Sequence, residues 1–478
     1  AFGVGAGEGW DEPLTTELGR WRGRSEMSQS WHMLLGVVVF PLGLCRTPSW
    51  AEETPAPRSA ARQDTSQTDG SEAARQEGSG GKEVDVVKWM AKRRQFTIRG
   101  VDYGFTGLPI LYFSPTTGWN VGLRGQLLDY RRLPYRYKMT FYSMRSSEGR
   151  MVVRYSLKVP RIAGTGFGMR LVVSYKRDLR ARFYGQGNDS ERNTDYIECQ
   201  GIPDENGNCP GNPDFRDEFY YLYSLRNPRV IASALRHIYG PLSMSVGIGL
   251  ETADVDQRGE FKALYKEEGT PDNVVDGISG FVGATLSWDS RDNDVMPRRG
   301  AFHEWSYETS RNSLVTGLFF KEIDFQRYTI TDLRYFAVSD RTTFAHRTVF
   351  EVLSGEVPLY AFGEVGGSKR SKGLGGSDSL RGFDRQRFTD NVRLFTNSEV
   401  RYLLRNTRAF RQYLDWYGVL FMDTGQVAPG RGDLAVGRTH WTSGLGVRVS
   451  WNTDFVIRSE LGFSPEQTRF GVKYRNVF

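Results

Sequence analysis

The chain has 478 residues, of which 39% are hydrophobic and 13% aromatic, a length that allows two or three soluble domains or one large membrane barrel with an appendage. No stretch holds 18 consecutive apolar residues, which excludes transmembrane helices, while the aromatic share and the 54 glycines suit strands with one apolar face, one polar face and many turns. The net charge of +7 is modest, and no basic helix or RNA-binding signature accompanies it, so we expect no nucleic-acid partner.

The N-terminal part has the pattern of an export signal. Residues 1–26 show no periodicity and stay unexplained, and a better-formed unit begins at Met27. An apolar run from Met33 to Leu44 has signal-peptide length, and Ser49-Trp50-Ala51 places small residues at the usual processing positions. We therefore expect residues 27–51 to be a signal peptide, with a short buried helix as the alternative.

A polar segment follows, from residue 52 to residue 95. Its first part, 52–81, is rich in Ala, Ser, Gln, Glu, Gly and Pro and almost lacks large apolar residues, so it cannot bury enough surface to offset the ordering of its backbone. Residues 82–94 fit either one short amphipathic helix with a basic end or a loop. We expect residues 52–95 to be a disordered periplasmic linker.

From about Phe96 to Phe478 the hydrophobic period is two, as in Val121, Leu123 and Leu127. Sixteen strands over residues 96–478 leave roughly 24 residues for each strand with its connection, which is plausible for a barrel. The expected strands are 108–112, 119–130, 135–145, 150–159, 167–176, 217–236, 242–252, 276–287, 300–309, 319–336, 342–351, 392–404, 413–427, 440–450, 454–463 and 467–478.

The expected strand 217–236 contains Asn227-Pro228, which could instead be a turn between two strands. Loop lengths favour one strand. With a single strand there, the longest connections, 177–216, 253–275 and 352–391, all fall on one rim, and the short turns fall on the other, as outer-membrane barrels require.

The last of these connections holds the sequence Gly-Gly-Ser-Asp-Ser-Leu-Arg-Gly-Phe, a glycine-rich loop with a single arginine, Arg381. In the strands that follow it, alternation places Glu399 with Asn397 and Arg401, and Asp423 with Phe421, on the face opposite the apolar one. Lumen carboxylates on neighbouring strands can hold a guanidinium bidentately in a partly dehydrated interior.

The Arg381-Gly382-Phe383 loop, the later F-x-D-x-G strand around Asp423 and the final Phe478 resemble the Omp85 family (bacterial surface antigen D15; BamA and TamA type) of outer-membrane β-barrels. The resemblance implies an all-β, 16-stranded antiparallel transmembrane barrel with a long inward-folded loop. It also implies that Arg381 docks on Asp423 with Glu399 nearby. Leu380 stands where the family prefers Val or Ile. The docking either pins a plug loop or takes part in substrate handling.

Shorter motifs add to the resemblance and occur in the family's order along the barrel. They are Pro109–Tyr112 with Pro115–Trp119, Phe183–Asn188, and Asp289–Asn293 followed by Pro297 and Gly300. Each motif alone is weak, because Gly, Pro and Asp punctuate any hairpin.

The end of the chain resembles the recognition signal of barrels that the outer-membrane assembly machinery inserts. Gly471, Tyr474 and terminal Phe478 lie on an alternating strand that ends on an aromatic residue. We expect this chain to be a client of that machinery.

Cys199 and Cys209 lie in the expected long connection after strand 167–176. In an exported protein they favour a disulfide over free thiols. A metal site is not expected, because the five histidines are scattered, and no G-x-S-x-G, H-E-x-x-H or P-loop occurs. We therefore expect no enzymatic activity and no cofactor.

The leading functional hypothesis is an Omp85-type barrel, contacting outer-membrane lipid, that helps insert or translocate unfolded proteins or lipids. Most of the family carries periplasmic POTRA modules. Residues 52–99 are too few for one such module, so we expect a periplasmic partner to replace them or the barrel wall to act alone. A weakly paired seam between the first strand, with Pro109, and the last would open. The alternative is a passive pore or structural barrel plugged by its arginine loop; an enzyme acting on lipid is disfavoured.

Overall fold

The computed structural model describes residues 95–114, 117–131, 135–162, 165–259, 263–267, 276–310, 323–368, 370–409, 412–451, 455–474 and 477–478. The chain divides into two units, Ala1–Ala74 and Arg75–Phe478, and all described residues belong to the second. Residues 1–26, the expected signal peptide (27–51), the expected helix (82–94) and all of the expected linker except residue 95 lie outside the described residues.

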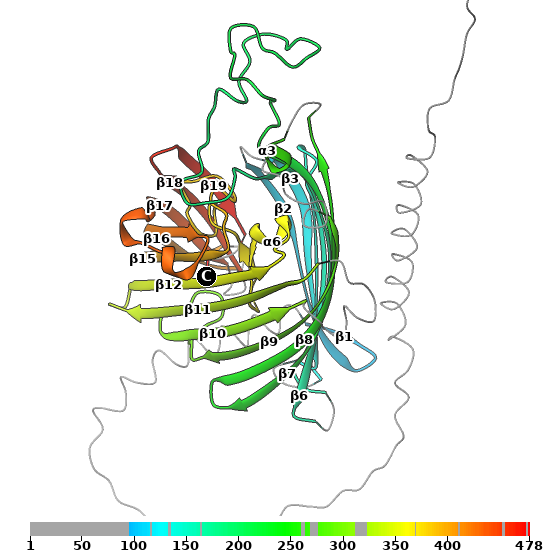
Figure 1. Ribbon diagram of the computed structural model, residues 1–478. Coiled ribbons are helices and arrows are strands. Elements are labelled where there is room, and N and C mark those ends of the chain that lie inside the picture. The colour runs from blue at the N-terminus through cyan, green and yellow to red at the C-terminus, as the bar shows by residue number, and fades with distance from the viewer. Residues whose placement is uncertain are drawn as a thin grey trace, which may run out of the picture. The chain divides into compact units, whose positions relative to one another are not determined.

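In the part of the chain that the structure describes, sixteen long strands form the wall of a barrel, and each pairs antiparallel with the next along the chain (Figure 1). They are β2 Val101–Ser114, β3 Gly118–Asp129, β4 Tyr137–Ser146, β5 Met151–Val159, β6 Phe167–Arg182, β7 Leu222–Tyr239, β8 Leu242–Gln257, β9 Gly277–Asp289, β10 Gly300–Thr309, β11 Phe325–Ala337, β12 Thr342–Gly355, β15 Val392–Ala409, β16 Gln412–Ala428, β17 His440–Trp451, β18 Phe455–Phe463 and β19 Thr468–Lys473. The predicted sixteen-stranded antiparallel barrel is confirmed.

The other elements among the described residues are short. Strand β1, Gln95–Ile98, folds back on the start of β2. Between the long strands lie α3 Leu264–Glu267, α6 Leu359–Phe362, β13 Glu364–Val365, β14 Ser371–Lys372, η3 Arg431–Asp433 and η4 Val436–Arg438. No helix among the described residues is long and apolar enough to cross a bilayer.

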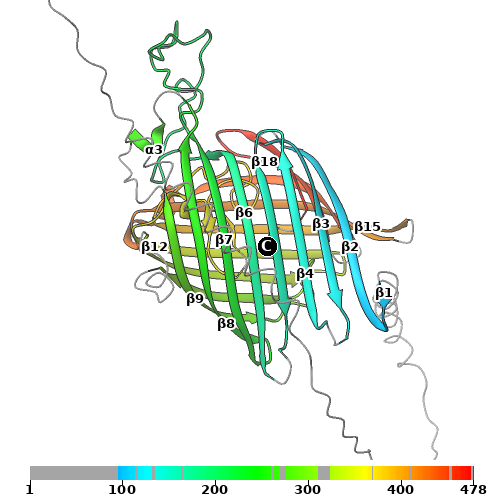
Figure 2. The ribbon, with the colours of Figure 1, turned by 90° about the vertical axis from the view of Figure 1, so that its right-hand side faces the viewer.

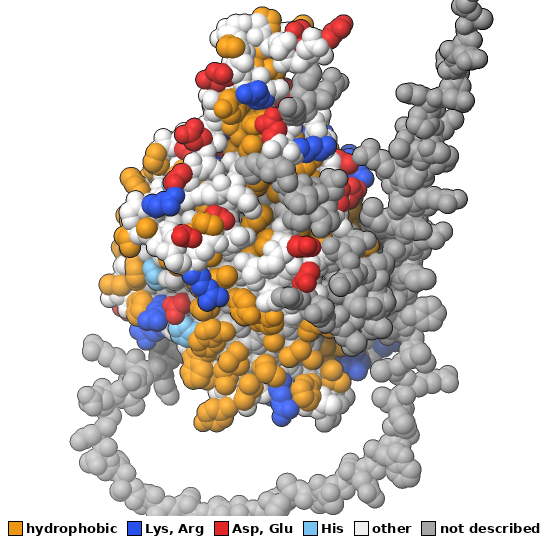
Figure 3. Space-filling view, viewed as in Figure 1, with side chains coloured by type: hydrophobic (Ala, Val, Ile, Leu, Met, Phe, Trp, Pro, Cys, Tyr) orange, Lys and Arg blue, Asp and Glu red, His pale blue; other side chains and the backbone are white. Residues whose placement is uncertain are grey.

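Alternation along each strand separates an apolar outer face from a polar inner one. On β9, β10 and β11 the outward side chains Trp288, Trp305 and Ile330 are 41%, 49% and 44% exposed. Figure 3 shows hydrophobic side chains gathered over the lower part of the face on which these strands lie. Inward neighbours such as Glu304 and Arg327 are buried. The outer face therefore suits lipid, and the inner face encloses charged groups.

Strand β7 runs without a break through Asn227 and Pro228. Both residues pair with β6, but neither has a register partner on β8, where the pairing resumes at Arg229. The Asn227 side chain instead donates to Glu251 and to the Thr252 carbonyl oxygen of β8, at 3.0 and 2.7 Å. Strand 217–236 is therefore one strand, as predicted, although it begins and ends later. The connections 183–221, 258–276 and 356–391 consequently share one rim, and Figure 2 shows the connection between β6 and β7 projecting from that end.

The seam between the first and last strands differs from the expectation in detail. The expected first strand, 108–112, proves to be the 14-residue β2, because the glycine-containing stretch before Pro109 still alternates. The short partner is β19, with six residues. The described residues of β19 and β2 show no run of paired residues, whereas every other neighbouring pair of long strands has one. Side chains join them instead: the Tyr474 hydroxyl donates to the Leu111 carbonyl oxygen at 2.9 Å.

Candidate functional site

The connection 356–391 folds into the barrel, where an apolar cluster gives it a core of its own. Leu374, Leu380, Phe383 and Phe388 of this loop are at most 2% exposed and pack against wall residues that include Phe395. Gly375 and Gly376 have φ of +103° and +89°, a backbone conformation that glycine adopts readily, and so allow the tight turn at this point of the loop. Burial of this cluster explains why so long a loop keeps one conformation.

Arg381 projects from this loop onto the strand wall. Its Nε and Nη2 donate to the two carboxylate oxygens of Asp423 on β16 at 2.9 and 2.7 Å, and its backbone N–H donates to the same carboxylate at 3.1 Å. Nη1 donates to Glu399 on β15 at 2.7 Å and to Glu460 on β18 at 3.2 Å. One guanidinium thus bridges three carboxylates from three strands.

These three carboxylates also shift the pKa of the Arg381 guanidinium. Burial alone lowers the pKa of the Arg381 guanidinium, but Asp423, Glu460 and Glu399 outweigh it and raise that pKa above the ordinary value. The charge is therefore permanent. The carbon at the centre of the guanidinium also lies 3.5 Å from the centroid of the Phe421 ring, a cation–π contact.

The carboxylates have further partners on the wall. Arg448 of β17 donates to both Glu399 and Glu460, at 2.5 to 2.8 Å, and Arg401 Nε donates to Glu399 at 2.8 Å. Arg458 donates to Glu460, and it also reaches the Ser377 carbonyl oxygen of the loop at 2.7 Å. The result is a buried, alternating network of charges rather than a single ion pair.

Two glycines permit the close approach of loop and wall. A Cβ on Gly382 would lie 2.7 Å from backbone atoms of Phe463 on β18, and a Cβ on Gly462 would lie 2.9 Å from backbone atoms of Arg381. Backbone atoms cannot move aside as a flexible side chain can. Phe383, the next residue, packs edge-on against Phe388 and His440 at centroid distances of 5.1 and 5.8 Å.

Arg347 of β12 connects the loop to the C-terminal segment. Its guanidinium donates to the Asp378 carbonyl oxygen of the loop, to Asn397 at 2.6 and 3.0 Å, and to the Val477 carbonyl oxygen at 3.3 Å. Phe478 lies with its ring 5.2 Å from the same guanidinium and packs on the inner wall beside Tyr335.

The three residues of the expected assembly signal therefore lie in different surroundings. Gly471 lies in β19, Tyr474 contacts the seam, and Phe478 turns away from the strand into the lumen, where both ribbon views mark the C-terminal end (Figures 1 and 2). The expectation that the last strand continues to Phe478 is wrong, because side chains of the opposite wall bind the end of the chain.

A second connection closes over the same rim. Asn188, in the segment that follows β6, donates to the Arg438 carbonyl oxygen at 2.7 Å and accepts from the Val427 N–H at 3.0 Å, so the segment reaches β16 and the loop after it. The Gly187 N–H donates to the Thr389 carbonyl oxygen of the inward loop at 2.9 Å. The two connections thus hold each other across the barrel end.

Asp384 is the electrostatic centre of that contact. Arg182, at the end of β6, and Arg192, in the connection after it, lie 2.5 and 3.4 Å from its carboxylate, and Arg469 of β19 lies 3.6 Å away. Burial raises the pKa of Asp384, but these arginines outweigh burial and lower the pKa below the ordinary 3.8.

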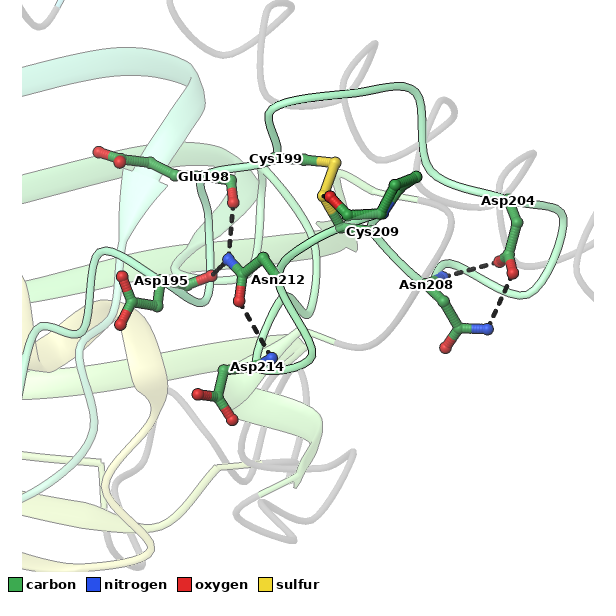
Figure 4. Close-up of a disulfide and its surroundings, with 9 residues drawn as sticks. Asp195, Glu198, Cys199, Asp204, Asn208, Cys209, Asn212 and Asp214 are labelled. Carbon is green, nitrogen blue, oxygen red and sulfur yellow. Dashed lines mark hydrogen bonds between the residues drawn. A yellow bond between two sulfur atoms is a disulfide. The ribbon is translucent and has the colours of Figure 1, made fainter.

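Beyond this contact, the connection projects as a hairpin with a disulfide between Cys199 and Cys209, whose Cα atoms are 5.7 Å apart (Figure 4). Figure 4 shows polar residues on either side: Asn212 donates to the carbonyl oxygens of Asp195 and Glu198, at 2.7 and 2.8 Å, and so ties the base of the hairpin. Within the described part of the chain, no group of three or more His, Cys, Asp or Glu could hold a metal.

The structure thus brings Arg381, Gly382, Asp423 and Glu399 together. Sequence reasoning missed Arg448, Arg458 and Glu460, although a signal existed. All three fall on the polar face of the two expected strands before the last one, and a charge on the inward face of a barrel strand needs a partner.

Comparison with known proteins gives the family. The Omp85 superfamily domain matches residues 218–462. BamA from Haemophilus ducreyi, lacking POTRA domains 1–3, is similar with a TM-score of 0.50 and 10% identity over 83% of this chain and 78% of that one. CdiB from Escherichia coli gives 0.48 and 11% over 80% of this chain and 63% of that one, and CdiB from Acinetobacter baumannii gives 0.42 and 13% over 78% and 60%.

The chain therefore covers less than two thirds of either CdiB structure. No curated protein matches it. The BamA likeness shows the barrel fold, and the domain match covers half of the chain. The chain belongs to the Omp85 superfamily of outer-membrane β-barrels.

Proposed function

We propose that this outer-membrane barrel assists the insertion or translocation of proteins, or of lipids, by opening between β19 and β2. The observation that carries the proposal is the unequal pairing around the barrel. Strands β15 and β16 pair over 17 positions, whereas β19 has six residues, and the side chain of Tyr474, just after it, contacts β2. An edge that few backbone bonds hold can separate and offer its N–H and C=O groups to an incoming strand.

The docked loop supports this mechanism. Arg381 and Gly382 bind the inner face of β15 to β18, so they hold rigid the wall that ends beside the seam. Arg347 joins the same loop to the C-terminal segment through Asp378 and Val477. Movement of β19 therefore disturbs contacts of the loop. We propose that loop docking and seam opening are coupled, that Gly471, Tyr474 and Phe478 form the signal for barrel insertion, and that the barrel performs no catalysis.

Proteomics after depletion tests the function in cells. Cells depleted of the protein are rescued with wild type, with Asp423→Arg, or with Asp433→Arg, which makes the same charge change at an exposed residue of η3. We expect other barrels or surface lipoproteins to fall on depletion and to recover with wild type and Asp433→Arg but not with Asp423→Arg. Heat-modifiable migration must show that each rescue protein is folded.

If only this protein changes in abundance, the assembly function is refuted for abundant barrels. The second candidate, a passive barrel, is favoured by the two connections that fill one end of the lumen. Its own prediction is a single-channel conductance that rises in Arg381→Ala while other barrels keep their abundance.

A cross-link separates the seam from the rest of the barrel. Cysteines at Leu111 and Tyr474, joined by a short bismaleimide, fix the seam, and cysteines at the paired residues Leu420 and Leu445 provide the matched control. In liposomes we expect wild type and the control to speed the folding of a urea-denatured client barrel, and the fixed seam to abolish this. Equal acceleration by the fixed seam would contradict the gating mechanism.

A further inference from the structure

Strands β3 to β6 have an unbalanced charge. They contain two acidic residues, Asp129 and Asp178, and ten basic ones, a net +8 in a chain whose total is +7. The basic residues are Arg124, Lys138, Arg145, Arg154, Lys158, Arg170, Lys176, Arg177, Arg180 and Arg182. The rest of the chain is therefore close to neutral, and the excess charge lies in one part of the wall.

Several of these residues face the lumen, and we call five of them, on adjacent strands, the basic wall: Arg124, Lys138, Arg154, Lys158 and Arg170. Their direction follows from the register. Val121, Leu123 and Phe141 point outward, 57%, 49% and 43% exposed, and the basic wall takes the opposite parity. Arg154 and Lys158 are exposed and the other three half-buried, so water and solutes can reach this part of the lumen.

The basic wall places like charges directly opposite each other. Lys138 pairs with Lys158, and Lys158 pairs with Arg170, which makes a row of three cations across β4, β5 and β6. Directly opposed like charges destabilise a sheet. Paired strands are about 4.8 Å apart, so these flexible side chains can converge on one group. The fold by itself gives no reason for such a row.

Among the described residues, neighbouring acids and the inward loop make few contacts with this row of three cations. On the inward face of β3 to β5 the described residues include no acid. Two acids of other elements act on the row electrostatically, Asp294 on Lys138 and Glu304 on Arg170. Asp294 lies 3.4 Å from Arg291, and Glu304 accepts the Ser368 N–H at 2.9 Å. Among the described residues, the loop meets the row at Arg170, which donates to the Ser368 carbonyl oxygen at 3.3 Å.

Apolar side chains share the inward face with these cations. Ile110 of β2, Met144 of β4 and Val172 of β6 point inward and are 4%, 3% and 6% exposed. Val172 lies beside Arg170 of the row, whereas Ile110 and Met144 lie nearer Arg124. A cation beside an apolar group suits an amphiphile whose head carries concentrated negative charge. Phosphate fits three converging cations better than a single carboxylate does, because it presents several strong acceptor oxygens and up to two charges.

We propose that the basic wall is a binding site for the phosphate headgroup of an anionic lipid that enters the lumen from the membrane beside β2. The proposal deepens the proposed function, on which it rests for the opening between β2 and β19. Lipid binding is nevertheless measurable without any client protein, so either proposal can fail alone.

The test is native mass spectrometry of the full-length protein in an uncharged detergent, with dioleoyl phosphatidic acid as the probe. Lys138→Gln with Lys158→Gln removes two lumen charges. Arg145→Gln with Arg177→Gln is the matched control, since it removes two exposed charges that the register places on the outward face of the same sheet. We expect about tenfold weaker binding or more in the lumen variant, as for the loss of a charge-assisted contact, and no change in the control.

The remaining arms identify the ligand. Lys138→Arg with Lys158→Arg keeps the charge and should keep the affinity, which separates charge from damage to the fold. Dioleoyl phosphatidylcholine, whose headgroup is neutral overall, should bind at least tenfold more weakly. Equal affinity of the lumen variant for phosphatidic acid would overturn the site. Inorganic phosphate that binds as tightly as the lipid, or a polyglutamate peptide that alone binds, would overturn the lipid headgroup.

Discussion

Removal of the Arg381 side chain should release the inward loop while leaving the barrel folded. Arg381→Ala deletes four side-chain hydrogen bonds to three buried carboxylates. Each charge-assisted bond contributes about 1.5–3 kcal/mol, but the carboxylates keep other donors: Thr442 for Asp423, and Arg448 for Glu399 and Glu460. We therefore expect about 3 kcal/mol, the lower end for breaking a buried ion pair.

Hydrogen exchange measures the loss of stability in the loop separately from that of the barrel. A cost of about 3 kcal/mol corresponds to about a hundredfold loss of protection for amides of the loop around residues 374–388. Amides of β3 to β8, far from the contact in the sheet order, should keep their protection. Arg405→Ala, at an exposed position of β15, is the matched control and should change neither region. Loop protection that falls less than threefold in Arg381→Ala would refute the claim that this network holds the loop.

Further changes probe the inward loop and the projecting connection after β6. Gly382→Ala should release the loop as Arg381→Ala does, because its Cβ would meet backbone of β18 at 2.7 Å, whereas Gly471→Ala meets nothing within 4 Å and should be silent by hydrogen exchange. Replacement of Cys199 and Cys209 by serine should speed proteolysis at the hairpin tip, since a loop of this size contributes about 3 kcal/mol, without altering heat-modifiable migration; equal cleavage would contradict this. The pKa of Asp384 is lowered in the folded state, so its charge stabilises the loop above the unfolded pKa near 3.8. This stabilisation is lost as the pH falls through the lower folded pKa. Hydrogen exchange of the loop should therefore accelerate below about pH 4 in wild type but not in Asp384→Asn.

The candidate site could be predicted only in part. Alternation places Asp423 and Glu399 on the inward face, and the glycine-rich stretch marks the loop that carries Arg381. Glu460 and Arg448 lie on later strands, and the sequence does not show which inward charges lie at one height in the barrel. That depends on the register of β15 to β18, which backbone pairing sets.

The basic wall, too, could be predicted only in part. Its lysines and arginines are visible in the sequence as a surplus of charge in four strands. Their alignment as a row depends on the pairing of Lys138 with Lys158 and of Lys158 with Arg170, which a shift of one residue would undo.

By itself the sequence determined the class of this protein, because a two-residue period fixes which side chains face lipid and which face the lumen, whatever the strands pair with. It also determined the number of strands and the rim on which the long connections lie, since antiparallel neighbours alternate direction. Only the tertiary structure decided how the seam is held and where in the barrel the C-terminal segment lies. Those outcomes depend on contacts between segments far apart in sequence, such as Arg347 with Val477 and Leu111 with Tyr474, which no local pattern encodes.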